Sequence, residues 1–434
     1  MGPVLSIINR RGAVNAITSL CLALATLPLQ AEPASPLSLE EALGIAQANA
    51  PALNAAALGA QASRHIAIAA SQQSDPVLRA GVDNLPISGP ERLSLGRDFM
   101  TMRRIGVMQE YVSSGKRLLI RERNELEASR QDALGRKLAA NLRRDVAIAW
   151  LDRFYAVKSR EFLKTLAAEL EVQLRTLDSQ LRAGKATAIE FPITSAALLQ
   201  TWDRMLVIDK QERLAHIVLA RWLGEEANRT LGTPPNIEEL LADLASPDIV
   251  SASPSLLEHS RELDIAKTEL AIAEKNKQPN WSWEVAYQQR GSAYSNMVSV
   301  GISVPLPVNA SERQDREIAA RRSQLEQAQE LHENLRREIQ AGVASNHAEW
   351  QSLIERRKRL AGALLPLARQ RVDLSLASYR TGQSSLATVL EARRAEVEIH
   401  LQLLDLERET ARLWAELRYV YLETAKAVAP GARP

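Results

Sequence analysis

The sequence has very little cysteine, few aromatic residues and no excess of either charge. Its 434 residues include one cysteine, 19 glycines, 19 prolines and 4 % aromatic residues. A single cysteine excludes a disulfide within the chain. The 54 basic and 52 acidic residues give a net charge of +2, so the chain lacks the basic field that binds nucleic acid. The rest is rich in Ala, Leu, Glu, Arg and Gln, a composition typical of long helices.

Motifs of catalysis and of metal binding are also missing from the sequence. There is no Walker loop, dinucleotide fingerprint or nucleophile elbow. The histidines are scattered, without a close pair at metal-ligand spacing, which favours solvated or packed helix residues. We therefore expect no catalysis, no cofactor and no metal site. The six histidines are His65, His216, His259, His332, His347 and His400.

Residues 1–31 have the pattern of a secretory signal peptide. Arg10 and Arg11 precede an apolar run over residues 17–29, and a small residue, Ala31, stands where cleavage is expected. The run is short for a transmembrane helix. Cys21 lies inside it, so we expect no cysteine in the mature protein. The residue before Cys21 is a leucine rather than a small residue, which argues against lipidation but leaves it open.

Two stretches in the second half alternate between apolar and polar residues. Strands that cross a bilayer need about 9–11 residues, with apolar side chains facing lipid and small or polar ones facing a wet interior. Aromatic side chains suit the level of the lipid headgroups. We predict strands over about 281–290 and 297–306. The residues predicted to face the membrane are Trp281, Trp283, Val285, Tyr287, Val298, Val300, Ile302 and Val304.

The chain contains an internal repeat. Pro51 and Pro76 have the same separation as Pro254 and Pro279, and in both halves the first proline opens a helix and the second precedes a strand. A repeated spacing of this kind indicates a repeated structural unit. Each half reads as helix, strand, strand, long helix, turn and long helix. We predict a first repeat over 32–252, with strands at about 76–87 and 103–112, and a second repeat over 253–434.

The predicted helices after the strands are too long for a compact domain. Residues 118–181 contain no proline and would span roughly 96 Å as one helix. The helix over 311–380 is interrupted only by Pro366. Apolar residues recur at intervals of four and seven, as in a helix with one seam to bury. The return helices, 189–223 and 386–422, are expected to pack antiparallel against them.

Four strands cannot close a membrane barrel within one chain. An open sheet edge cannot face lipid, and the smallest common membrane barrels have about eight strands. Two copies would give eight strands with a filled interior, whereas three would give twelve and leave a lumen. The small residues Ser299, Gly301 and Ser303 on the inward face favour a lumen, so we expect a homotrimer with its barrel in lipid.

Several motifs occur in an order that resembles the TolC-type outer membrane efflux factors, over essentially all of the mature chain. They are the helix that opens at Leu37 to Leu43, the segment Gln109 to Arg117 after the second strand, Gly301 to Pro307 at the end of the fourth, and the two Arg-x-Gly turns at Arg182 and Arg380. The resemblance implies a mainly α fold with a trimeric twelve-stranded barrel and a periplasmic tunnel of helical hairpins. It also implies two partners, a periplasmic adaptor (membrane fusion protein) and an inner-membrane pump of the RND type.

The resemblance further implies functional residues near the ends of the hairpins. In this family, acidic residues on an inner helix near the tip narrow the pore and select cations, and Asp373 is the candidate here. No second acid follows one turn later, and a surface salt bridge is the alternative role. For the turn glycines, the alternative is a plain helix C-cap. The residues predicted to contact the adaptor are Arg182, Gly184, Lys185, Arg380, Gly382, Gln383 and Ser384.

The cargo is less determined than the fold. The segments Arg97 to Met102 and Glu274 to Gln278 are similar to the heavy-metal, CzcC/CusC-like branch of the family. We therefore expect passive conduction of heavy-metal cations, with drugs or other small molecules as the alternative. A periplasmic adaptor or a structural coiled coil is the alternative of a different class, but neither needs strands rich in Trp. The sequence leaves the cognate pump and the resting state of the gate open.

Overall fold

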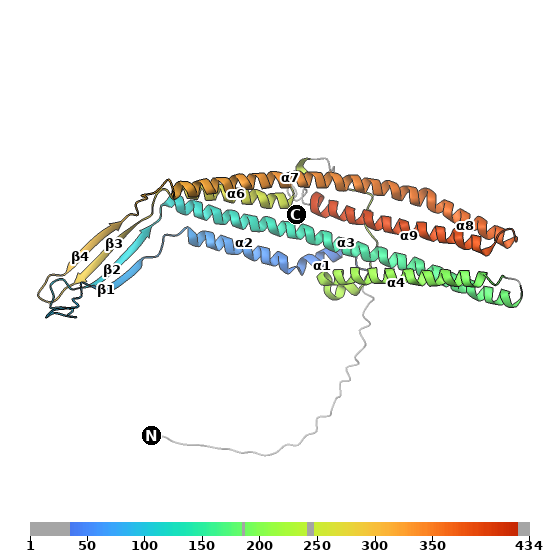
Figure 1. The fold of residues 1–434 in the computed structure, drawn as a ribbon, viewed down its shortest axis with the longest axis horizontal. Helices are drawn as coiled ribbons and strands as arrows, with labels where there is room; N and C mark the ends of the chain where they lie inside the picture. The colour runs from blue at the N-terminus through green and yellow to red at the C-terminus, as the bar shows by residue number, and fades with distance from the viewer. Residues whose placement is uncertain (1–34, 185–186, 241–246, 424–434) are drawn as a thin grey trace, which may run out of the picture. The chain divides into compact units, whose positions relative to one another are not determined.

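Two long helical hairpins and a four-stranded antiparallel sheet make up the fold, as Figure 1 shows. The computed structural model describes residues 35–184, 187–240 and 247–423. All but Ser35 lie in one compact unit that starts at Pro36. The predicted signal peptide, with Cys21, lies outside the described residues. The mainly helical fold with four strands per chain confirms the predicted fold class.

Local sequence signals explain where several helices begin. The Ser38 side chain accepts a hydrogen bond from the Glu41 N–H, and the Ser113 side chain accepts one from the Lys116 N–H. These are N-caps, which satisfy backbone donors that a helix start leaves free. The elements of the first half are α1 (Leu39–Ala48), α2 (Pro51–Ala70), β1 (Val77–Asp83), β2 (Met102–Tyr111), α3 (Ser114–Arg182), α4 (Glu190–Leu223) and the 3₁₀ turn η1 (Gly224–Asn228).

The second half repeats this order with one interruption. Its first long helix contains a π-helical turn, η2, directly before Pro366, whereas α3 runs through the matching part of the first half without a break. Proline cannot donate the backbone hydrogen bond of a regular helix, and π turns form where the ladder is disturbed. The elements are α5 (Pro247–Ser251), α6 (Pro254–Lys275), β3 (Trp281–Gln289), β4 (Met297–Ser303), α7 (Gln314–Arg359), η2 (Leu360–Leu364), α8 (Leu365–Arg380), α9 (Leu386–Glu416) and the π turn η3 (Leu417–Leu422).

The sheet joins the two halves of the chain. Its strand order is β1-β2-β3-β4, so the central pair, β2 with β3, connects the first repeat to the second. One line of paired residues crosses all four strands through Val77, Met108, Glu284 and Gly301. β2 leads almost directly into α3 at one end, and the turns between paired helices lie at the other end of the hairpins (Figure 1).

Two predicted strands end earlier than expected. β1 stops at Asp83 rather than near residue 87, because Asn84 adopts a left-handed conformation with φ of 57°. β4 stops at Ser303 rather than near residue 306, and prolines follow at 305 and 307, which cannot donate to a strand ladder. Val304, predicted as a membrane-facing strand residue, therefore lies one position beyond β4.

Packing is densest in the middle of the helices and thins toward the turns. The largest hydrophobic cluster contains Trp150, Trp414 and Tyr419, and each of these side chains is buried. Closer to the turns there are two smaller clusters, one around Leu163 and Leu170 and one around Leu177 and Leu386. Elements with few buried apolar contacts open most easily. The hairpin ends are therefore held by smaller apolar contacts than the middle of the helices.

Candidate functional site

One face of the sheet is apolar over all four strands. Cross-strand partners on this face include Val107 with Val285 and Val285 with Val300. Several of its side chains are exposed to the surroundings of the single chain, with Val300 74 % exposed and Ile302 71 % exposed. An exposed apolar face of this extent marks a surface that meets lipid or another protein. The apolar residues of β1 and β2 on this face are Leu78, Ala80, Val82, Ile105, Val107 and Tyr111, and the register places two polar residues of β2, Arg103 and Gln109, on the same face.

The membrane-facing residues predicted from alternation lie on this face, apart from Val304. Val285, Tyr287, Val298, Val300 and Ile302 are exposed. Three aromatic side chains, Tyr111, Trp281 and Trp283, lie at the end of the strands nearest the helices, where Trp281 and Trp283 are half-buried. The Tyr111 and Trp281 rings pack with their centroids 5.1 Å apart. Their placement fits an aromatic belt at the level of lipid headgroups.

The opposite face of the sheet is polar and charged. Arg104 on β2 pairs with Glu284 on β3, with Nη2 and Oε1 2.5 Å apart. Longer ion pairs connect Arg104 with Asp83 at 3.7 Å and Arg79 with Glu284 at 3.8 Å. The Ser299 hydroxyl and the Gln288 side-chain oxygen lie 3.0 Å apart. The same four strands therefore present an apolar face and a hydrated one, as a channel wall requires.

Gly106 lies where β2 and β3, from the two halves of the sheet, pack closely together. A Cβ atom at this position would lie 2.7 Å from the Ala286 Cβ and 3.0 Å from the Val285 carbonyl oxygen. Real Cβ atoms do not come this close, so β2 and β3 pair in this way only with glycine at 106. A Cβ atom on Gly301 of β4 would have no other atom within 4 Å. Both glycines lie in strands predicted from the sequence, but alternation alone does not distinguish them.

Each of the two hairpin turns contains a glycine with a left-handed backbone conformation. Gly184 and Gly382 have φ of 67° and 75°, in the left-handed region that ends helices. Arg182 pairs with Asp178 at 2.8 Å and has a 79 % exposed side chain. Arg380 is also exposed. Each turn thus presents an arginine to the surroundings.

Hydrogen bonds to backbone carbonyls stabilise the second turn, between α8 and α9. The Gly382 N–H donates to the Tyr379 carbonyl, the Gln383 N–H donates to the Ser378 carbonyl at 2.9 Å, and the Ser384 hydroxyl donates to the Ser375 carbonyl at 3.3 Å. Of the predicted adaptor-contact residues, Lys185 lies outside the described residues. The others lie at the two turns.

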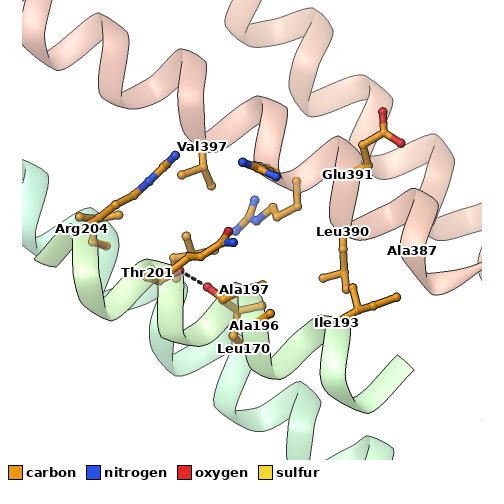
Figure 2. Close-up of a pocket in the computed structure, with 15 residues that line it drawn as sticks. Leu170, Ile193, Ala196, Ala197, Thr201, Arg204, Ala387, Leu390, Glu391 and Val397 are labelled. Atoms are coloured by element: carbon orange, nitrogen blue, oxygen red, sulfur yellow. Dashed lines mark hydrogen bonds between the residues drawn. The ribbon is translucent and has the colours of Figure 1, made fainter. Parts of the chain in front are cut away.

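A cavity of about 360 Å³ lies between the first hairpin and α9 (Figure 2). Its floor is apolar, with Leu170 from α3, Ala197 from α4, and Leu390 and Val397 from α9. Thr201, which also lines it, donates its hydroxyl to the Ala197 carbonyl at 2.8 Å. Apolar concavities with polar edges are the usual form of a binding groove. This groove is a second candidate docking surface, beside the turns.

Ion pairs across this cavity connect the two hairpins. Arg393 on α9 contacts Glu169 on α3, and Arg204 on α4 pairs with Glu398 on α9 at 2.9 Å. Arg393 also pairs at 2.6 Å with Glu396, a buried carboxylate. This groove was not predicted from the sequence, because its charged partners are far apart in the chain. The periodic apolar positions of α9 are the signal that points to it.

Asp373 lies exposed on α8, near the second turn. Its arginine neighbours bind other acids, since Arg371 pairs with Glu391 at 3.5 Å and Arg369 with Glu396 at 3.6 Å. Among the residues that the structure describes, no ion pair involves Asp373. The predicted role of Asp373 in a gate, and its alternative as a surface salt bridge, stay predictions.

The histidines do not assemble into a site. Over the described ranges, no group of three or more His, Cys, Asp and Glu side chains has the arrangement needed to hold a metal ion. His400 stacks on Phe162, with ring centroids 4.0 Å apart. Burial lowers the pKa of His400, and the positive charge of Arg369 lowers it further. Among the described helices, none combines the length and the apolar character needed to span a membrane.

Comparison with known proteins gives a family match over part of the chain and several solved structures with the same fold. Residues 246–420 match the family model described as outer membrane efflux protein. This match covers the second repeat from α5 to the last π turn, and so includes β3, β4 and the second hairpin. A search of curated protein sequences gives no match.

Solved structures share the fold over most of their length. The chain superposes on CusC with a TM-score of 0.75 at 16 % identity, covering 88 % of this chain and 91 % of that one. It superposes on the outer membrane protein VceC of Vibrio cholerae with a TM-score of 0.71 at 16 % identity, covering 88 % and 95 %. The open state of the MtrE outer membrane channel of Neisseria gonorrhoeae gives 0.72 at 14 % identity, covering 88 % of each. The chain therefore has the fold of outer membrane channels.

Proposed function

We propose that the protein is the outer membrane channel of a tripartite efflux system. The observation that carries the proposal is the four-stranded sheet, which is apolar on one face and charged on the other and continues into two helical hairpins. A sheet with these two faces separates lipid from water. Three copies would supply twelve strands for a barrel in the outer membrane, and the hairpins would form the periplasmic tunnel below it.

In this proposal the protein conducts its cargo passively. A periplasmic adaptor and an inner-membrane pump of the RND type supply the cargo, and the chain itself carries no catalysis. The adaptor would dock at the hairpin ends, where Arg182 and Arg380 are exposed, and in the apolar groove beside them. Asp373 on α8 would narrow the pore and favour cations, since a trimer brings three of its carboxylates toward one axis.

Heavy-metal cations are the proposed cargo. The support is the similarity of residues 97–102 and 274–278 to the heavy-metal branch of the efflux factors. Drugs or other small molecules are the alternative cargo. Deletion of the gene, followed by growth tests against a panel of divalent metals and a panel of drugs, separates the two. Sensitivity confined to drugs would overturn the metal proposal and leave the channel proposal intact.

The channel proposal itself is tested by localisation and mass. We expect the full chain, expressed with its signal peptide, to fractionate with the outer membrane. In detergent it should have the mass of a trimer, and it should migrate differently on gels before and after heating. A monomer in the soluble periplasmic fraction would overturn the proposal and favour an adaptor or a structural coiled coil. A variant with Val300→Asp on the apolar face is the negative control, because a charge on the lipid side should reduce insertion into the membrane.

A further inference from the structure

The two outer strands of the sheet each have one unpaired edge. In the described part of the chain, β1 pairs only with β2, and β4 pairs only with β3. Each of these strands has seven residues, and alternate residues therefore leave backbone donors and acceptors open along the unpaired side. In lipid, each unsatisfied backbone group costs several kcal/mol. If the chain is the trimeric channel proposed above, β4 of one subunit must pair with β1 of the next.

The observed register limits how this pairing is aligned. Val77 on β1 and Gly301 on β4 lie on one line of paired residues across the sheet, and this line is the reference for the alignment of the next subunit. Strands in a closed barrel must tilt, so a line of paired residues that is followed once around the ring returns to the first strand at a different residue. In a symmetric trimer, one third of this total offset is counted at each junction between subunits.

The faces of the sheet limit the offset at each junction to even numbers. Even-numbered residues of both outer strands, such as Val82 and Val300, lie on the apolar face, and odd-numbered ones, such as Arg79 and Gly301, lie on the polar face. A shift by one residue would turn one strand over and place charges in lipid. Apolar must therefore pair with apolar across the junction.

Barrel geometry limits the size of the offset. With a rise of about 3.3 Å per residue and a strand spacing of about 4.8 Å, an offset of two residues per junction gives a tilt of about 19°. Offsets of four and six give about 35° and about 46°. Membrane barrels tilt by about 35–45°. Offsets of four and six residues per junction thus give a tilt found in membrane barrels, and an offset of two residues gives a tilt that is too small.

The extent of β1 fixes the direction of the offset. A shift toward the start of β1 would place Gly301 opposite Gln73 or Ser71, which precede the strand and follow α2. A shift toward the end of β1 places it opposite Gly81 or Asp83, inside the strand. Only the second direction pairs strand with strand.

We infer that Gly301 of each subunit lies opposite Gly81 or Asp83 of the next, an offset of four or six residues toward the end of β1. Val82 then faces Val300 or Ile302 of its neighbour, both on the lipid side. On the polar side, Asp83 faces Ser299 or Gly301. This inference rests on the proposed trimeric channel and adds the alignment of its subunits.

Cysteine cross-linking tests the alignment in the full-length protein. The only natural cysteine, Cys21, lies in the predicted signal peptide, so Cys21→Ser gives a cysteine-free background. Directly paired residues on antiparallel strands have Cα atoms about 4.5–5.5 Å apart, which is within the range that a disulfide spans. Diagonal neighbours lie too far apart for a disulfide. Within one chain β1 and β4 are three strand spacings apart, about 14 Å, so a disulfide between them joins two subunits.

We expect Val82→Cys to form covalent dimers and trimers with Val300→Cys or with Ile302→Cys under mild oxidation of whole cells. Val82→Cys with Val298→Cys tests an offset of two, and Leu78→Cys with Val300→Cys tests no offset. Cross-links in either of these control pairs, or in none of the four pairs, would overturn the inference. The cysteine-free parent must itself be an outer membrane trimer; if it is not, the proposed function fails instead.

Discussion

Trp150 and Trp350 make the same hydrogen bond in the two halves of the chain. The Trp150 indole N–H donates to the Leu37 carbonyl at 3.2 Å, and the Trp350 indole N–H donates to the Ile237 carbonyl at 3.2 Å. In each of the two bonds, the donor residue and the acceptor residue are 113 positions apart in the sequence. Each indole comes from a long helix, α3 or α7, and each carbonyl from a segment outside the helices. The repeat therefore extends to the bonds that attach these segments to the helical core.

Removing either indole N–H should destabilise the protein. Trp150→Phe and Trp350→Phe keep an aromatic ring, but the first leaves the Leu37 carbonyl with only the Gly232 N–H, 2.9 Å away, and the second removes the indole donor of the Ile237 carbonyl. A buried polar group that loses its partner costs about 1–3 kcal/mol. We expect both variants to lower the unfolding temperature of the purified protein in detergent. Trp202→Phe, at a side chain that is 44 % exposed, is the control and should change it little. A loss in only one of the two variants would show that the two bonds are not equivalent.

Sequence periodicity sufficed for the class of fold and for the two faces of the sheet, because both depend on local patterns. The period of two in Val298 to Ile302 survives in the structure as an exposed apolar row. Periodicity did not predict the ends of the strands, since alternation of side chains does not specify the left-handed backbone conformation of Asn84.

Features that depend on contacts between distant segments were also beyond the sequence. The contact between Arg393 and Glu169 joins residues 224 positions apart, so neither residue signals the other. The special need for glycine at 106 arises only when β2 pairs with β3 of the other repeat. In both cases the information lies in how the two halves dock, and a single sequence does not contain it.

A lysine should have opposite consequences at two adjacent positions of β4. Val300→Lys places a charge on the apolar face, where a lysine at the middle of the bilayer costs about 2–4 kcal/mol. Ser299→Lys places the same charge on the polar face. We expect the first variant to reduce the amount of trimer in the outer membrane and the second to insert normally. Immunoblots of outer membrane fractions measure this, and equal insertion of both variants would contradict the assignment of the faces.

Glycine should be required at 106 and dispensable at 301. Gly106→Ala places a methyl group 2.7 Å from the Ala286 Cβ, and overpacking of this kind costs about 1–3 kcal/mol. Gly301→Ala meets no atom within 4 Å in the single chain. We expect a lower unfolding temperature for the first variant and little change for the second. If the two variants are equally stable, the close approach of β2 and β3 does not hold in the assembled protein.

The contact between the hairpins at His400 should weaken in mild acid. Burial lowers the pKa of His400 from its ordinary value of 6.5, so the folded state binds fewer protons than the unfolded state. Its stabilising contribution is present above about pH 6.5 and is lost as the pH falls through the lowered pKa. Arg369 adds to this shift, and Glu396 and Glu407 oppose it.

We expect His400→Phe, which keeps the stack on Phe162, to reduce the loss of unfolding temperature between about pH 8 and about pH 5.5. His65→Phe, at an exposed position on α2, is the control and should leave the pH dependence unchanged. A wild-type protein whose unfolding temperature is as sensitive to acid as that of His400→Phe would rule out this residue as the cause.

Neutralising Asp373 should reduce the preference of the channel for cations. In a trimer, Asp373→Asn removes three negative charges from the ring proposed near the tunnel entrance, and rings of acidic side chains favour cations. Because local potentials of this kind change ion concentrations severalfold, we expect the ratio of cation to anion permeability in planar bilayers to fall by roughly two- to tenfold. Asp178→Asn is the matched control: Asp178 lies on α3 near the other turn and pairs with Arg182 at 2.8 Å. An equal effect of both variants would point to the general charge of the hairpin ends, and an unchanged ratio in Asp373→Asn would remove this residue from the gate.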